Sequence, residues 1–303
     1  MTDGREALAN STSDNPVAGS TPAGRVNTGG DGRADAGSAA PIRIAVIGHG
    51  EAGSLIAGGL LAAGALVIGF DAVTPRSPTT PLAETLEQAV AHADLVLSLN
   101  SSTVAARIAE QVAPLLAPGA LFADLNTGTP ALKRKLAALF DDGSFADVAI
   151  MKPVPGLAEK VPMGVAGTGA ARVIELLAPF GLNLEYVSDV PGEAAARKLL
   201  RSILAKGMAG VLIDCLWAAE SMGLQDWAYA EILNEFETSN AETAKRYLTG
   251  TAQHVKRRQI EMMDVVEMLD ESGYESTMIA PIEFNYGRIL HGKKIPFSKP
   301  PRA

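Results

Sequence analysis

The stretch from Ile42 to Asp71 constrains the fold more than any other part of the chain. A β-branched run, residues 42–47, leads into the glycine pattern Gly-x-Gly-x-x-Gly at residues 48–53. An apolar helical segment follows, and a second apolar run, residues 66–70, ends on an acid. Glycines at this spacing let a chain turn sharply out of a strand, approach a pyrophosphate and pack a helix tightly on a sheet. The stretch therefore predicts a strand, a turn and a helix that bind a dinucleotide.

The alternative is a glycine-rich turn without a ligand. The position of the pattern between a strand and a helix, with an acid after the second run, favours the cofactor site. Asp71 would accept hydrogen bonds from both ribose hydroxyls and repel a 2′-phosphate, so we expect NAD, with NADP as the alternative. Arg76 could fold back onto that phosphate, although a solvated loop charge is the favoured interpretation. The cofactor-binding residues predicted in this segment are Gly48, His49, Gly50, Glu51, Ala52, Gly53 and Asp71.

The composition is that of a globular protein and excludes several classes of partner. Hydrophobic residues make up 47% of the chain and charged residues 20%, and 303 residues give room for two domains. We expect no membrane span, and the net charge of −8 argues against nucleic acid or an anionic membrane as a partner. The single cysteine, Cys215, excludes an intrachain disulfide and is expected to be a buried small hydrophobe. The four histidines lack ligand spacing, so we predict no metal.

The chain is expected to consist of three segments. Residues 1–40 have almost no large apolar side chains and no targeting pattern, which predicts a disordered tail and a cytoplasmic protein. Residues 41–191 alternate strands and helices, which is typical of a Rossmann-type α/β domain with a mostly parallel sheet and helices on both faces. Residues 192–303 show helical periodicity only, which predicts an all-α domain.

The expected strands are 42–47, 66–70, 94–99, 120–124, 145–150, 163–167 and 183–187, and the expected helices of the first domain are 51–63, 82–92, 101–113, 130–139 and 170–179. Breaks in the C-terminal helical pattern are expected near Gly223, Ser239–Asn240, Gly250 and Gly273.

Loops that follow the strands of such a sheet lie against its ligand. The loop after strand 94–99 offers groups for the ribose and nicotinamide, or alternatively an N-cap for the next helix. A second candidate loop runs from Asp124 to Pro130, and a third, from Met151 to Gly156, could form a stiff pocket wall. The cofactor-binding residues predicted in these loops are Leu99, Asn100, Ser101, Thr103 and Asn126.

One face of the helix that starts after Gly192 is polar. At 100° per residue, its members fall within about 140° of arc, and they are Lys198, Arg201, Ser202, Ala205, Lys206 and Ala209. The remaining faces carry Leu199, Leu200, Ile203 and Leu204. The polar face could be a solvated surface or a cavity wall that receives an anion, and periodicity alone favours the surface.

Together, these motifs resemble the β-hydroxyacid dehydrogenase superfamily, which includes 3-hydroxyisobutyrate and 6-phosphogluconate dehydrogenases. The resemblance covers residues 41–290 and includes the Asp147-to-Pro155 stretch and a lysine, Lys198, six residues after Gly192. It extends to a branch whose C-terminal half is a domain of unknown function, through Leu125-Asn126-Thr127, Pro153-Val154-Pro155 and Lys206-Gly207.

The resemblance implies that Lys198 is the general acid/base, exchanging a proton with a substrate hydroxyl as hydride moves to or from the nicotinamide. Burial and two neighbours, Arg201 and Lys206, would lower its pKa from the free value near 10.4, as that role requires. With the family added, the polar helix face is expected to be a cavity wall. The implied substrate-binding residues are Asn126, Thr127, Gly128, Met151, Lys152, Ser202 and Lys206, the first two acting as hydrogen-bond donors.

Three positions depart from the family pattern and leave the substrate open. The usual Ser-Thr pair is Asn126-Thr127, the usual Ser-Gly-Gly is Met151-Lys152-Pro153, and the asparagine four residues after the lysine is Ser202. The second change adds bulk and a cation to the predicted pocket. Together with Arg201 and Lys206, that cation favours a carboxylate or phosphate on the substrate.

We therefore expect an NAD(P)-dependent dehydrogenase or reductase for a small anionic hydroxy or carbonyl compound, and the resemblance implies a homodimer that pairs through the C-terminal helices. One alternative is an imine reductase of the same architecture, against which the presence of Lys198 counts. Another is a nucleotide-binding protein without catalysis, which the retained lysine, Thr127 and full glycine pattern oppose. Oxidative decarboxylation would lack its proton donor, because Ala205 stands where that acid is expected.

Overall fold

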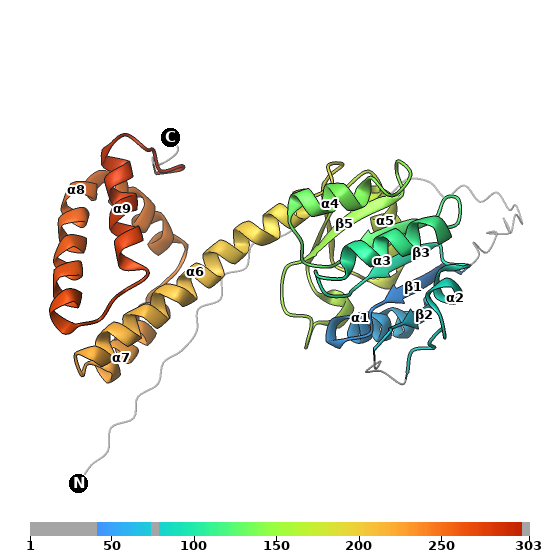
Figure 1. Ribbon diagram of the computed structural model, residues 1–303, viewed down its shortest axis with the longest axis horizontal. Helices are drawn as coiled ribbons and strands as arrows, with labels where there is room; N and C mark the ends of the chain where they lie inside the picture. Colours follow the sequence, from blue (N-terminus) through green and yellow to red (C-terminus); the bar gives the residue numbers. More distant parts are fainter. Residues whose placement is uncertain (1–40, 74–78, 299–303) are drawn as a thin grey trace, which may run out of the picture. The chain divides into compact units, whose positions relative to one another are not determined.

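The computed structural model describes residues 41–73 and 79–298. The predicted tail at residues 1–40 and Arg76 lie outside this part of the chain. The described residues begin at the first strand of a sheet and continue through an α/β region into a series of long helices (Figure 1).

Within the described residues, seven strands form one sheet in the order β2-β1-β3-β4-β5-β6-β7. All neighbouring strands are parallel except β5 and β6, which are antiparallel. The sheet confirms the expected mostly parallel α/β architecture. Its strands are β1 (Arg43–Ile47), β2 (Leu66–Phe70), β3 (Leu95–Ser98), β4 (Leu121–Asp124), β5 (Phe145–Ile150), β6 (Met163–Ala166) and β7 (Leu184–Ser188).

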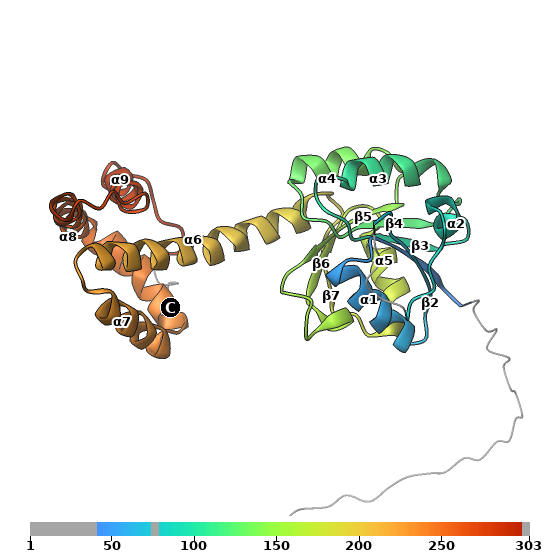
Figure 2. The same cartoon turned by 60° about the horizontal axis from the view of Figure 1, so that its bottom comes forward.

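Helices cover both faces of the sheet, as Figure 2 shows. One buried cluster joins the sheet to α1 (Glu51–Ala62) and α5 (Ala170–Leu177). A second cluster on the other face joins it to α2 (Leu86–Val90), α3 (Ala105–Val112) and α4 (Pro130–Ala137). Because the central strands are buried on both faces, they read as continuous apolar runs rather than as alternating patterns.

Up to residue 298, four helices follow the last strand: α6 (Glu193–Ser221), α7 (Gln225–Thr238), α8 (Ala241–Ser272) and α9 (Ile279–Leu290). The break expected near Gly250 corresponds to a kink four residues later, at His254, where α8 departs from helical geometry with φ −123° and ψ 24°. Cys215 is exposed on α6, so the expectation of a buried cysteine is wrong. Among the described helices, none is both long and apolar enough to cross a membrane.

Two adjacent glycines of α1, Gly58 and Gly59, differ in their surroundings, and the segment after β5 packs against Gly59. This segment contains a short 3-10 helix, η2 (Ala158–Lys160). A Cβ on Gly59 would lie 2.0 Å from Glu159 Oε2 and 2.8 Å from Glu159 Cβ, whereas a Cβ on Gly58 would have no heavy atom within 4 Å. Gly59 therefore allows the segment to approach the helix, and Gly58 does not contribute to that approach.

The glycine pair predicts opposite effects of one substitution. Gly58→Ala should stabilise the protein by about 0.5–1 kcal/mol, because alanine loses less backbone entropy in a helix. Gly59→Ala gains the same entropic stabilisation, but its methyl group forces Glu159 and the backbone of that residue away from α1. The melting temperature of Gly59→Ala should therefore lie below that of Gly58→Ala. Adding Glu159→Gly to Gly59→Ala should recover part of the loss, and equal melting temperatures for the two single variants would contradict this packing.

Candidate active site

In the Gly-x-Gly-x-x-Gly fingerprint, Gly48 and Gly53 lie against backbone atoms, whereas Gly50 faces open space. Gly48 has φ +101°, donates its N–H to Phe70 O at 2.8 Å, and would bring a Cβ to 2.3 Å from Leu99 O. A Cβ on Gly53 would lie 1.8 Å from Gly48 O, so the start of α1 touches the turn directly. At Gly50, the N-cap of α1, a Cβ would have no heavy atom within 4 Å. This open space, in front of the free N–H groups of a helix start, fits a pyrophosphate.

Asp71 follows β2 and is fixed by two backbone donors. The N–H of His49 donates to its Oδ2 at 2.6 Å, and the N–H of Val73 donates to its Oδ1 at 2.8 Å. The carboxylate therefore sits beside the glycine turn, where it can accept hydrogen bonds from a ribose. The His49 side chain is fully buried and neither ring nitrogen has a partner among the described residues. Burial lowers the pKa of His49, and the charge of Asp71 partly opposes this effect.

A cavity of about 410 Å³ brings together loops and a helix that are far apart in the sequence. The loops after β3, β4 and β5 form part of its wall, and the first turns of α6 complete it. The predicted site residues that line it are Ala52, Leu99, Asn100, Asn126, Thr127, Met151, Lys152, Lys198, Ser202 and Lys206, with Arg201 from the same helix face. The polar face of α6 is therefore a cavity wall, although Arg201 and Lys206 also remain exposed to solvent.

The other predicted residues lie outside this lining. Gly128 packs against Leu132 and the side chain of Lys133, where a Cβ would lie 3.1 Å from Leu132 Cδ2. The hydroxyls of Ser101 and Thr103 are exposed and bond to each other at 2.7 Å. Neither hydroxyl caps α3, whose N-cap, Val104, has no side-chain hydrogen bond. The glycine turn and the start of α1 contain Gly48, His49, Gly50, Glu51 and Gly53, and Asp71 lies beside this turn.

Asn126 presents an acceptor to its surroundings rather than a donor. Its Nδ2 donates to Asp124 Oδ1 at 2.5 Å and to Ser98 Oγ at 3.0 Å. Because a carboxylate only accepts hydrogen bonds, these contacts fix which way the amide faces. Asn126 is 5% exposed, and its Oδ1 has no partner among the described residues. The sequence-based expectation that Asn126 acts as a donor therefore does not match this geometry.

Beneath the cavity lies a buried ionic cluster that the sequence analysis missed. Asp124 and Asp147 are register partners on the adjacent strands β4 and β5. The Nζ of Lys133 lies 2.7 Å from Asp124 Oδ2 and 3.0 Å from Asp147 Oδ1, and all three side chains are at most 1% exposed. Asp147 Oδ2 also accepts the N–H of Ala195, in the first turn of α6, at 2.9 Å. The sequence signal for a buried Lys133 is its spacing of three residues from Leu136, which places both side chains on the same face of the helix.

Lys198 is half-buried and surrounded mainly by positive charge. Its pKa is lowered, first because burial disfavours the ammonium form and then because Lys133 repels it. Asp147 acts in the opposite direction, and Lys206 adds a smaller lowering effect. A lysine with a lowered pKa can exchange a proton near neutral pH, which suits a general acid or base.

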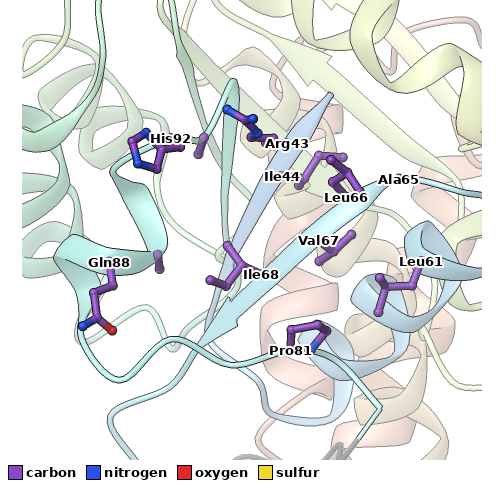
Figure 3. Close-up of a pocket in the computed structure, with 12 residues that line it drawn as sticks. Arg43, Ile44, Leu61, Ala65, Leu66, Val67, Ile68, Pro81, Gln88 and His92 are labelled. Carbon is purple, nitrogen blue, oxygen red and sulfur yellow. The ribbon is translucent and has the colours of Figure 1, made fainter. Parts of the chain in front are cut away.

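A second cavity, of about 600 Å³, lies around the edge strand β2 and is shown in Figure 3. Its wall is mostly apolar and includes Leu61, Val67 and Pro81, with Arg43 and His92 adding polar groups. It includes residues at the amino ends of β1 and β2, whereas the glycine turn follows the carboxyl end of β1. None of the predicted site residues lines it, so we assign the chemistry to the cavity that contains Lys198.

Comparison with known families divides the chain into two matched regions. Residues 43–173 match the family described as the NAD binding domain of 6-phosphogluconate dehydrogenase. Residues 219–286 match a domain of unknown function, DUF1932.

Solved structures extend the likeness over most of the chain. A conserved hypothetical protein from Sinorhizobium meliloti 1021 is 32% identical, covering 81% of this chain and 87% of its own, with a TM-score of 0.54. A conserved protein of unknown function, described as similar to 3-hydroxyacid dehydrogenases, is 25% identical, covering 82% and 97%, with a TM-score of 0.54. An imine reductase variant from Myxococcus stipitatus in complex with NAD+ is 18% identical, covering 85% and 97%, with a TM-score of 0.70. The same enzyme is also known with NADP+.

The fingerprint geometry predicts that two glycine substitutions have separable effects. Gly50→Val should leave the melting temperature nearly unchanged, because its side chain enters open space, but should weaken NADH binding by at least about tenfold by occupying the pyrophosphate position. Gly53→Ala should lower both the melting temperature and the affinity, because it collides with Gly48 O. Fluorescence titration with NADH and thermal unfolding measure the two properties, and unchanged affinity in Gly50→Val would contradict the assigned site.

Proposed function

The chain belongs to the β-hydroxyacid dehydrogenase superfamily, in the branch with the C-terminal domain of unknown function, and we propose that it is an NAD(P)-dependent oxidoreductase. It transfers a hydride between the nicotinamide and a small, polar, anionic hydroxy or carbonyl compound. Lys198 is the general acid/base of this reaction. The single observation that carries the proposal is the cavity in which Lys198 meets residues of three strand-end loops next to the dinucleotide fingerprint.

The protein contributes binding, orientation and a proton. The glycine turn and the start of α1 hold the pyrophosphate, and Asp71 accepts hydrogen bonds from the ribose. The nicotinamide supplies the hydride acceptor or donor when it is bound. During oxidation, neutral Lys198 takes the proton of the substrate hydroxyl at its Nζ, and during reduction the ammonium returns it. The Oδ1 of Asn126, which has no partner among the described residues, would accept a hydrogen bond from the carboxamide of the nicotinamide or from the substrate hydroxyl.

The charges of the cavity support an anionic substrate. Lys152 enters from the loop after β5, and Arg201 and Lys206 enter from α6. No acidic residue is among the described residues that line this cavity. A carboxylate or phosphate near these cations leaves the hydroxyl-bearing carbon for Lys198, while Thr127 offers a hydroxyl as a further donor.

The position of Asp71 supports NAD over NADP in this proposal. Its carboxylate, held by two backbone N–H groups, cannot turn away from the ribose without losing both hydrogen bonds. A 2′-phosphate placed there would meet a fixed negative charge. NADP remains the alternative, to be tested alongside NAD in the assays below.

The proposed enzyme works as a homodimer that pairs through its C-terminal helices. The side of α6 that does not line the cavity exposes Leu200, Ile203 and Leu204 at 65%, 70% and 67%. Trp227 on α7 and Phe284 on α9 are each 66% exposed. Exposed side chains of this size on α6, α7 and α9 offer apolar area that association between chains would bury.

A charge placed on this surface tests the dimer. The wild type is expected to sediment as a dimer at micromolar concentration, whereas the double variant Ile203→Glu/Leu204→Glu should sediment as a monomer because two carboxylates would have to be buried. Leu139→Glu, at a position 40% exposed just after α4, is the matched control and should remain dimeric. A wild-type monomer, or a dimer in the double variant, would overturn the proposed pairing.

Replacement of Lys198 tests the reaction. Lys198→Met should lower kcat by about 10²–10⁴-fold while NADH affinity stays within about twofold, because the change removes the proton exchange and no cofactor contact. The base must be neutral for oxidation, so kcat/KM for oxidation should rise with pH. Because the pKa of Lys198 is lowered, it should level off at a pH below the usual lysine range. Reduction should show the opposite dependence, since the acid must be protonated.

The measurement is absorbance at 340 nm with NAD and NADP against hydroxy acids, polyols and sugar phosphates, and with the reduced cofactors against carbonyl compounds and cyclic imines. Lys160→Met, an exposed lysine on η2, is the control and should retain full turnover. Turnover of imines alone, insensitive to Lys198→Met, would replace the proposed function with imine reduction.

A further inference from the structure

The buried ammonium of Lys133 has no place in the proton transfer itself, yet it lies directly under the site. It reaches from the first turn of α4 to the end of β4 and the middle of β5, and its three polar contacts are Asp124 O at 2.9 Å, Asp124 Oδ2 at 2.7 Å and Asp147 Oδ1 at 3.0 Å. The two contacts with Asp124 are hydrogen bonds, and the contact with Asp147 is an ion pair. With a side chain 1% exposed, Lys133 cannot leave this position to meet solvent.

The second carboxylate of this cluster connects it to the helix that carries Lys198. Asp147 binds Lys133 through Oδ1 and the N–H of Ala195 through Oδ2. Ala195 is three residues before Lys198, so the two residues lie about one turn apart on α6. The register of α6 against the sheet, and with it the position of the Lys198 side chain, is therefore fixed at the cluster.

We propose that Lys133 is a positioning residue for the reaction proposed above: held between Asp124 and Asp147, its fixed positive charge opposes protonation of Lys198. The inference rests on the proposed role of Lys198. Asp147 has two opposed effects, because it anchors α6 with one oxygen and attracts a proton to Lys198 with its charge. Lys133 neutralises part of that charge without loosening the anchor.

Charged groups around Lys198 come from several elements of the fold. Lys133 belongs to α4, Asp147 to β5 and Lys152 to the loop after β5, while Arg201 and Lys206 lie further along α6. Arg197, on the same helix, is paired with Glu185 of β7 at 3.1 Å. Lys152, Arg201 and Lys206 are exposed, so solvent screens their effect on Lys198. Lys133 and Asp147 are buried and act with little screening.

The test is the titration of Lys198 itself, measured on the full chain without substrate or cofactor. Acetic anhydride acetylates neutral amines, so the rate at Lys198, read by mass spectrometry against a free reference amine over a range of pH, gives the midpoint of its titration. The wild type is expected to titrate below the usual lysine range. Lys133→Met should raise the midpoint by about one pH unit, and Asp147→Asn should lower it, since the amide keeps an acceptor for the Ala195 N–H.

Shifts of the titration midpoint in opposite directions for Lys133→Met and Asp147→Asn indicate an electrostatic role. General damage to the fold would not be expected to shift the midpoint in opposite directions in the two variants. Lys135→Met, an exposed lysine two residues away on α4, is the matched control and should leave the midpoint unchanged. Should Lys133→Met fail to fold, Lys133→Met/Asp124→Asn removes one charge of each sign and should still raise the midpoint.

A midpoint that does not rise on loss of Lys133, or that rises in Asp147→Asn, overturns the inference. The outcome is independent of the proposed function, because the labelling requires no redox activity. If the midpoints shift as expected but the protein shows no turnover, the electrostatic coupling is supported and the oxidoreductase proposal is contradicted. If turnover depends on Lys198 but the midpoints do not move, the proposed function is supported and this inference is contradicted.

Discussion

The structure depends on one buried lysine placed between two carboxylates of neighbouring strands. Asp124, at the end of β4, and Asp147, in the middle of β5, are register partners, and without a cation two adjacent acids would repel each other. Lys133 supplies that cation from the first turn of α4, where a positive charge opposes the helix dipole. Removing one member of a buried ionic group costs about 3–5 kcal/mol, so the three residues are interdependent. The end of β4, the middle of β5 and the starts of α4 and α6 are thereby held together.

A different constraint, the close approach of one backbone segment to another, determines the glycine turn at the predicted cofactor site. At Gly48 and Gly53 a single methyl group would collide with carbonyl oxygens, whereas at Gly50 it would meet nothing within 4 Å. Two glycines of the fingerprint are therefore required by the protein's own packing, and the third leaves room for a ligand. The sequence motif has glycine at all three positions. The structure distinguishes the two glycines that folding requires from the one that leaves room for a ligand.

This difference explains how much could be predicted from the sequence. The strands were predicted to within one or two residues because they are short, apolar and bounded by turns, and the pocket loops because they follow strand ends. The buried role of Lys133 could not be predicted, since it requires the pairing of Asp124 with Asp147, a contact between strands that local pattern does not specify. The donor role expected of Asn126 does not match the structure, because its N–H groups are used by Asp124, two residues earlier, and by Ser98 on a different strand, a contact that local pattern does not specify.

The long helix α6 shows how one anchor can determine a whole site. Its first turn donates the N–H of Ala195 to Asp147, which places a negative charge at the positive end of the helix dipole. Because a helix is rigid over a few turns, fixing this end also fixes the rotation of the residues that follow. Lys198, Ser202 and Lys206 therefore line the cavity, while Leu200 and Leu204, on another side of the same helix, remain exposed. The separation of a charged cavity wall from an apolar surface follows from helical periodicity combined with a single buried carboxylate.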